Sequence, residues 1–249
     1  MGHSENKITD ILRKKGQQLI DQPYKKLEFT ENNEADNVLN NLVDFPHMFV
    51  LACIMDRQIN ASRAWIIPHE ISKEVNGYTM DKFLKLTLEE LNEIFHRKSL
   101  HRFNNKMSEY FYHGIQHIKN IYNGDASKIW IGIPKSATVV RRFIEFKGIS
   151  VKISTMATNS LARDFKIPFS DHISIDISPD VHVKRVFKRL GLLSKSASNE
   201  ELLYRAREMN PLYPGIFDLS CWEIGRNWCR PRSPQCTKCY MSDYCPKNM

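Results

Sequence analysis

Four cysteines near the end of the chain constrain its fold more than any other feature of the sequence. They follow the spacing C-x6-C-x2-C-x5-C, at Cys229, Cys236, Cys239 and Cys245. Pro231 and Pro234 interrupt the segment, and a proline inside a helix removes a backbone hydrogen bond. The segment 229–245 is therefore expected to be a loop, and its four thiols can converge on one metal centre.

Disulfides, zinc and an iron-sulfur cluster are the alternatives for these cysteines. Six cysteines in 249 residues, behind a polar N-terminus with no secretory pattern, favour reduced thiols over disulfides. Zinc ribbons usually contain two C-x2-C knuckles, whereas only Cys236 and Cys239 form one here. The spacing favours an iron-sulfur cluster, with zinc as the rival.

Composition predicts a soluble, intracellular protein with no membrane partner. The longest apolar run, residues 48–55, is far too short to cross a bilayer. The 36 Lys and Arg exceed the 28 Asp and Glu, which gives a net charge of +8. Such an excess favours a polyanionic partner, although a solvated basic surface is the commoner explanation. We expect a cytoplasmic monomer, associated with the nucleoid if the source is prokaryotic.

The hydrophobic pattern predicts an all-α fold. Residues 48–55 are apolar on every side, which is typical of a helix in the middle of a bundle. Thr87 and Glu90 have the spacing of a capping box. Asp56 and the polar residues after it should end the buried helix. Helices are expected over about 6–22, 34–44, 48–55, 62–75, 101–122, 135–145 and 199–209.

Residues 146–157 predict two helices joined by a tight turn that contains Gly148. Such a turn, with the N-terminus of the second helix, directs free backbone N–H groups toward one point outside the protein. A phosphate can bind there. The alternative is an ordinary corner between two packed helices.

Asp180 precedes a stretch of helical periodicity, 181–190. An aspartate in this position caps the helix, and the helix dipole favours its ionised form.

Three segments together resemble the endonuclease III family of DNA glycosylases. The cysteine spacing, preceded by residues 224–228, is similar to that family's cluster loop. Residues 146–152 resemble its L-P-G-V-G-x-K hairpin, and residues 180–191 resemble its D-x-H-V-x-R-V-x-x-R-L-G segment. The hairpin departs from the family pattern at Lys147, in place of proline, and at Ser150, in place of glycine.

The resemblance implies two helical domains with a cleft between them. One is a six-helix domain, 34–165, that ends in the helix-hairpin-helix. The other combines 1–33 with 166–249 and carries the cluster loop, 229–245.

The resemblance also implies a base excision repair enzyme that acts on double-stranded DNA with a damaged or mismatched base. Lys152 would be the nucleophile that forms a Schiff base, and Asp180 would be the catalytic carboxylate. Nicking of the abasic site by β-elimination (AP lyase activity) would follow. The four cysteines would hold a [4Fe-4S] cluster.

Six further residues are expected to contact DNA. They are Gln58, Gly148, Ile149, Ser150, Arg230 and Arg232. The hairpin residues would bind the DNA backbone, and the two arginines of the cluster loop would meet phosphates. Gln58 would fill the gap left by an extruded base, because residues 51–61 resemble the family segment that ends in S-x-Q-x-x-D. The alternatives are a monofunctional glycosylase and a non-catalytic iron-sulfur DNA-binding protein.

Overall fold

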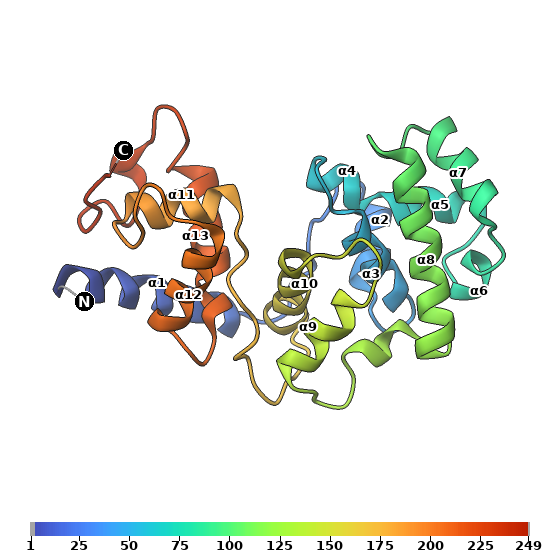
Figure 1. Cartoon of the computed structure of the whole chain (residues 1–249), viewed down its shortest axis with the longest axis horizontal. Helices are drawn as coiled ribbons and strands as arrows, with labels where there is room; N and C mark the ends of the chain where they lie inside the picture. The colour runs from blue at the N-terminus through green and yellow to red at the C-terminus, as the bar shows by residue number, and fades with distance from the viewer. Residues whose placement is uncertain (1–2, 249) are drawn as a thin grey trace.

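The protein is helical throughout, in a computed structural model that describes residues 3–248 (Figure 1). None of these residues lies in a β-strand, so the predicted all-α class is confirmed. The described part of the chain also contains no helix of the length and apolar character that a bilayer crossing requires.

The helices follow one another with short connections. The α-helices are α1 (His3–Asp21), α2 (Asn33–Asn40), α3 (Pro46–Met55), α4 (Ala61–Trp65), α5 (Ile67–Glu74), α6 (Met80–Phe83), α7 (Leu88–Arg97), α8 (Asn104–Tyr122), α9 (Ser136–Ile144), α10 (Val151–Arg163), α11 (Val181–Arg189), α12 (Asn199–Met209) and α13 (Asp218–Asn227). Short 3-10 helices are η1 (Ala126–Ile129), η2 (Pro214–Phe217) and η3 (Cys236–Lys238).

Several helix boundaries differ from the sequence prediction, among them the end of α2 at Asn40 instead of residue 44, and two of the differences have a clear local cause. The helix expected over 62–75 is divided into α4 and α5, with Pro68 in the first turn of the second. Proline suits that position because its missing N–H would have no partner there. The helix expected from residue 101 begins at Asn104, whose side chain accepts a hydrogen bond from the backbone N–H of His101, 2.9 Å away.

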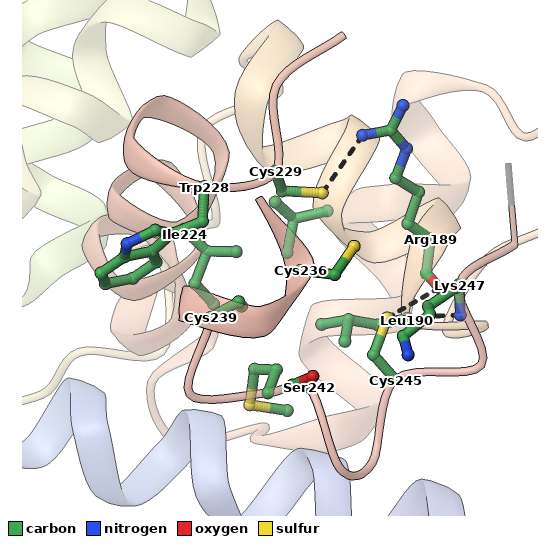
Figure 2. A pocket seen from close by; sticks show the side chains of 12 residues that line it. Arg189, Leu190, Ile224, Trp228, Cys229, Cys236, Cys239, Ser242, Cys245 and Lys247 are labelled. Carbon is green, nitrogen blue, oxygen red and sulfur yellow. Dashed lines mark hydrogen bonds between the residues drawn. The ribbon is translucent and has the colours of Figure 1, made fainter. Parts of the chain in front are cut away.

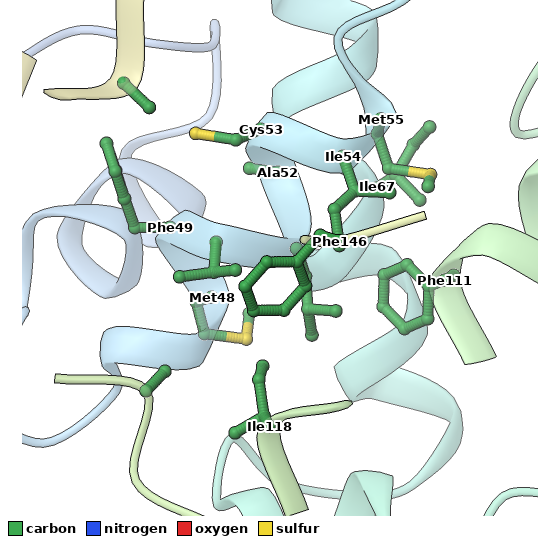
Figure 3. Close-up of a cluster of buried hydrophobic side chains, with 14 of the residues drawn as sticks. Met48, Phe49, Ala52, Cys53, Ile54, Met55, Ile67, Phe111, Ile118 and Phe146 are labelled. Atoms are coloured by element: carbon green, nitrogen blue, oxygen red, sulfur yellow. The ribbon is translucent and has the colours of Figure 1, made fainter. Parts of the chain in front are cut away.

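Buried side chains form two hydrophobic clusters. The larger one surrounds α3, whose ten residues are all buried, and α8 contributes Phe111 and Ile118 to it (Figure 3). The prediction of a helix in the middle of a bundle is therefore confirmed. The smaller cluster combines Ile8 and Leu12 of α1 with side chains of α11, α12 and α13. The two ends of the chain accordingly lie in the same group of helices, at the left of Figure 1.

Helix α10 lies between the two groups of helices (Figure 1). It is rich in buried polar residues. Several of their short side chains donate hydrogen bonds to backbone carbonyls one turn earlier in the same helix. Ser154 and Thr155 donate to the carbonyl of Val151, and Thr158 donates to that of Ser154. These bonds satisfy hydroxyls that would be costly to bury alone. Helix α10 can therefore be buried despite its polar composition.

Helices α11 and α13 approach closely at Gly225. A Cβ atom on this glycine would lie 2.7 Å from the Cβ of His182 and 3.0 Å from its carbonyl oxygen. The carbonyl oxygen of Gly225 also accepts a hydrogen bond of 2.8 Å from Nη2 of Arg185. Glycine is needed because only it allows the two backbones to come this close.

We predict that Gly225→Ala lowers the free energy of unfolding by about 1–3 kcal/mol, because the added methyl group forces α11 and α13 apart. Urea denaturation measures the change. Asn120→Ala, an exposed change in α8, is the control and should stay within about 0.5 kcal/mol of wild type. If the Gly225→Ala variant were as stable as wild type, α11 and α13 could move apart without lowering the free energy of unfolding, and the prediction would be wrong.

Candidate active site and cysteine loop

The predicted hairpin consists of α9, a turn over residues 145–150, and α10. Gly148 has a φ of +96°, which favours glycine. A Cβ atom there would lie 2.4 Å from Cδ2 of Tyr110, on α8. Glycine is thus required at position 148 by both its backbone angle and its neighbour.

The two departures from the family's hairpin pattern each have a structural role. Ser150 is the N-cap of α10, and its Oγ accepts a hydrogen bond of 3.4 Å from the N–H of Ile153. Lys147 forms an ion pair with Glu109 of α8. As the first two residues of a helix, Val151 and Lys152 have N–H groups without intrahelical acceptors. The turn can therefore still present free N–H groups to an anion.

Lys152 and Asp180 meet between the two groups of helices. Nζ of Lys152 lies 3.9 Å from Oδ2 of Asp180, and their side chains are 47% and 25% exposed. Asp180 is the N-cap of α11, and its Oδ1 accepts a hydrogen bond of 2.7 Å from the N–H of His182. The helix dipole at this end favours a carboxylate. An amine and a carboxylate are thus placed together where a substrate can reach them.

Asp56 is a third ionisable group at this site, and the sequence analysis did not predict it. Its side chain is partly buried and interacts electrostatically with Lys152 and Asp180. Burial raises the pKa of Asp56, and the charge of Lys152 partly offsets that rise. The sequence feature that could have identified Asp56 is its place directly after the all-apolar helix.

The segment after Asp56 lies against the hairpin. Nη1 of Arg57 donates a hydrogen bond of 3.4 Å to the carbonyl oxygen of Gly148. Gln58 is exposed and has a φ of +55°, in the left-handed region that residues with a Cβ atom rarely occupy. Backbone strain of this kind is often found at functional sites. Gln58, predicted to contact DNA, therefore extends from a strained segment that contacts the hairpin.

A polar network lies next to Asp180, between α10 and α13. Oδ1 of Asp218 accepts a hydrogen bond of 3.3 Å from the N–H of Ser178. Burial raises the pKa of Asp218 to about 6, an effect that the charge of Arg163 partly offsets. Nδ2 of Asn159 donates to the carbonyl oxygen of Gly215, 3.0 Å away, and so joins α10 to η2.

The four cysteines of the 229–245 loop line a single pocket (Figure 2). All four are free thiols, and the sulfurs of Cys229, Cys236 and Cys245 are visible around the pocket. Burial raises the pKa of Cys239 and of Cys245, so a bound cation is needed to hold them as thiolates. Within residues 3–248, no three side chains of His, Cys, Asp or Glu are arranged to hold a single metal ion. Four cysteines around one pocket match the number of donors that a [4Fe-4S] cluster takes, one for each iron.

Helix α11 holds the cysteine loop through two arginines. Nε of Arg185 donates to the carbonyl oxygen of Cys229, 2.7 Å away. Arg189 donates from Nη1 to Sγ of Cys229, at 3.4 Å, and to the carbonyl oxygen of Arg230, at 2.7 Å. Arg230 and Arg232 are themselves exposed. The helix that Asp180 caps therefore also supports the loop whose arginines are predicted to contact DNA.

Comparison with known proteins identifies the fold. No family model and no curated protein matches the chain. Among solved structures, a trapped covalent intermediate of endonuclease III with DNA matches with a TM-score of 0.61 at 17% identity, covering 100% of this chain and 98% of that one. A thermostable thymine-DNA glycosylase matches with a TM-score of 0.64 at 16% identity, covering 98% and 97%. An 8-oxoguanine glycosylase/lyase from Clostridium acetobutylicum, in complex with DNA, matches with a TM-score of 0.53 at 16% identity, covering 78% and 67%.

The chain therefore has the fold of the helix-hairpin-helix DNA glycosylases. The fold expected from the resemblance to endonuclease III is confirmed.

We predict that the free energy of unfolding depends less on pH in Asp218→Asn than in wild type. The folded state binds the Asp218 proton more tightly than the unfolded chain does, because the pKa is raised from 3.8 to about 6. The stabilising contribution of this group is therefore complete below about pH 4 and is lost as the pH rises through about 6. As the pH rises from about 4 to above about 6, the free energy of unfolding of the variant should increase by up to about 3 kcal/mol relative to that of wild type.

Urea denaturation near pH 4 and near pH 7 checks this prediction, because the carboxamide does not titrate. A difference between variant and wild type that stays the same at both pH values would contradict the assigned pKa.

Proposed function

We propose that the protein is a base excision repair DNA glycosylase that also nicks the abasic site it creates. The observation that carries this proposal is the pair formed by Lys152 and Asp180, 3.9 Å apart and partly open to solvent. An amine paired with a carboxylate can attack an electrophilic carbon and form a Schiff base. The fold shared with the glycosylases, and the excess of basic residues, are consistent with this chemistry.

Double-stranded DNA with a damaged or mismatched base is the proposed partner. A base inside a duplex cannot be reached, so its nucleotide must be extruded. The turn formed by Gly148, Ile149 and Ser150 would bring the free N–H groups at the start of α10 toward a backbone phosphate. Gln58 would fill the space left by the base, while Arg230 and Arg232 would contact phosphates further along the duplex.

The proposed reaction begins when the neutral amine of Lys152 attacks C1′ of the extruded nucleotide. The base leaves with the electron pair of the N-glycosidic bond and takes up a proton that the amine loses. The C1′–O4′ bond of the sugar ring then breaks, O4′ is protonated, and the opened sugar stays bound to Lys152 as a Schiff base. Asp180, ionised at the N-terminus of α11, stabilises the positive charge that develops on the sugar. Loss of a proton from C2′ then expels the 3′ phosphate by β-elimination.

The proposed division into domains follows most of the two hydrophobic clusters, with Phe169 and Ile175 of the second domain packed into the first cluster. Residues 34–165 would form one domain, and 1–33 with 166–249 would form the other. A cleft between them would admit the nucleotide, because Lys152 belongs to the first domain and Asp180 to the second.

We also propose that Cys229, Cys236, Cys239 and Cys245 hold a [4Fe-4S] cluster. When bound, the cluster supplies four iron-thiolate bonds that fix the loop, and the proposed reaction needs no electron from it. Arg185 and Arg189 connect this loop to α11. The loop can thereby keep Arg230 and Arg232 at a fixed distance from Asp180.

We predict that Lys152→Gln abolishes covalent trapping by borohydride on a duplex that contains one abasic site. Glutamine has no nucleophilic amine, so no Schiff base can form and be reduced. The measurement is the band of the protein-DNA adduct in a denaturing gel. Lys147→Gln is a matched control, because Lys147 lies in the same hairpin but is paired with Glu109; it should retain trapping.

A Lys152→Gln variant that traps as well as wild type would contradict the role of this residue. A wild-type protein that binds abasic DNA but never traps would exclude the lyase and leave a monofunctional glycosylase or a binding protein. Base release from duplexes with thymine glycol, uracil, 8-oxoguanine or methylated purines separates these two and identifies the substrate.

We predict that the purified protein is brown, absorbs near about 400 nm and contains about four irons per chain. Cys236→Ser should lose both the colour and most of the iron, because one of the four thiolates is removed. Cys53→Ala is the matched control, since Cys53 is buried in the other hydrophobic cluster. A colourless protein that contains zinc would show that these cysteines bind zinc instead.

A further inference from the structure

Arg226 is an exposed cation in the last turn of α13. Glu223, the nearest carboxylate in sequence, lies beside Lys15 of α1, with 3.9 Å between Oε2 of the acid and Nζ of the lysine. Within residues 3–248, the structure contains no ion pair that involves Arg226. The charge of Arg226 is therefore available to an anion from outside the protein.

The guanidinium of Arg226 lies over the indole of Trp222, one turn earlier on the same face of α13. Its Cζ atom is 4.9 Å from the centroid of the indole. The ring quadrupole attracts a cation in this position, and the attraction leaves the in-plane N–H groups of a guanidinium available. These N–H groups form a planar fork that matches two oxygens of a phosphate. Trp222 therefore holds Arg226 in place without occupying the donors that an anion needs.

Arg207 of α12 shows what a purely structural arginine looks like in the same group of helices. Its Cζ atom also lies over an aromatic ring, 5.1 Å from the centroid of Tyr204. Its Nε and Nη2 atoms each donate a hydrogen bond of 2.7 Å to the carboxylate of Asp176. The fork of Arg207 is thus occupied within the protein. Arg226 has the aromatic ring but lacks the acid.

Trp222 is connected to the reactive pair through one side chain, that of His182. The ring centroids of His182 and Trp222 are 6.4 Å apart. The backbone N–H of His182 donates a hydrogen bond of 2.7 Å to Oδ1 of Asp180. Oδ2 of the same carboxylate is the atom that lies 3.9 Å from Nζ of Lys152. Arg226 therefore lies within two side chains of the carboxylate in the reactive pair.

The structure that supports Trp222 is held together by hydrogen bonds. Nη2 of Arg185 lies 3.0 Å from Nδ1 of His182 and donates a hydrogen bond of 2.8 Å to the carbonyl oxygen of Gly225. Gly225 also lets α11 and α13 lie side by side (Figure 1). After α13 the chain enters the cysteine loop at Cys229. Arg226 is thus fixed on the stretch that leads from the reactive pair to the cysteine loop.

We propose that Arg226, held over Trp222, binds one phosphate of the DNA backbone next to the reaction centre. This inference rests on the proposed function, and it adds a phosphate site between Asp180 and the cysteine loop. The guanidinium would donate two N–H groups to the free oxygens of one phosphodiester. Trp222 is a positioning residue, because it acts only through Arg226. Such a contact reads no base, so it suits a duplex of any sequence.

The test is the salt dependence of DNA binding by Arg226→Gln. The probe is a fluorescent duplex with one tetrahydrofuran analogue of an abasic site, which the protein can bind without reacting. Fluorescence anisotropy gives the dissociation constant at a series of KCl concentrations. Each phosphate that a protein neutralises adds about 0.9 to the slope of log K against log salt concentration. We expect the slope of Arg226→Gln to be smaller than that of wild type by about 0.9. Binding near about 0.1 M salt should be on the order of 10-fold weaker.

Two further variants separate the charge of Arg226 from its geometry. Arg226→Lys keeps the positive charge and loses the planar fork, so the salt slope should equal that of wild type while binding weakens. Trp222→Leu keeps the charge and an apolar side chain but removes the aromatic face. It should also keep the slope, with binding about 2- to 5-fold weaker, because the arginine is no longer held in place.

Arg13→Gln is the matched control, because it removes an equal charge from another exposed arginine in the same group of helices. Nη2 of Arg13 is paired with Oδ1 of Asp10, 3.1 Å away on α1. This variant should bind the duplex with the affinity and the salt slope of wild type. The visible absorbance of every variant should equal that of wild type, which shows that the cysteine loop is intact.

The same measurements can overturn the inference. A cation near the C-terminus of a helix also offsets the helix dipole, and an arginine with that role alone would leave the salt slope unchanged in Arg226→Gln. A slope that falls as much in Arg226→Lys as in Arg226→Gln would mean that the substitutions disturb the structure, because lysine keeps the charge.

The outcome for the wild-type protein separates this inference from the proposed function. If wild type does not bind the duplex, the proposed function fails and the phosphate site fails with it. If wild type binds the duplex and is trapped on abasic DNA, while Arg226→Gln has the wild-type slope, the phosphate site alone is removed.

Discussion

The contact between Lys152 and Asp180 is the interaction on which the proposed chemistry depends. Each side chain extends from the first turn of a helix, and the two helices belong to different hydrophobic clusters. The 3.9 Å distance between amine and carboxylate is therefore a result of tertiary packing. Helix α10 maintains it, because its buried polar side chains are bonded within the helix and, through Asn159, to the opposite group of helices.

The cysteine loop is connected to this contact through one helix. Arg185 and Arg189 lie on α11, which begins just after Asp180, and both bond to the loop at Cys229. Close packing at Gly225 joins the same helix to α13, which leads into the loop. A change in the conformation of the loop can thus shift α11 and alter the position of Asp180. This connection would give the proposed cluster a mechanical purpose without any part in the proposed reaction.

Much of this organisation could be predicted from the sequence, because its strongest signals are local. The all-apolar run of α3 predicted a buried helix, and Gly148 marked the hairpin turn. Ser150 stands where the family pattern has glycine, and it caps α10. The spacing of residues could not show this role, because capping depends on backbone geometry. Asp56 was missed because its electrostatic interaction with Lys152, a residue distant in sequence, arises only in the fold.

Identifying the residue that becomes bonded to DNA tests the central claim most directly. Protein trapped by borohydride on abasic DNA can be digested with protease, and the peptide that carries the sugar fragment can be sequenced by mass spectrometry. The account predicts a single modified residue, Lys152. Modification at another lysine or at the N-terminal amine would contradict it.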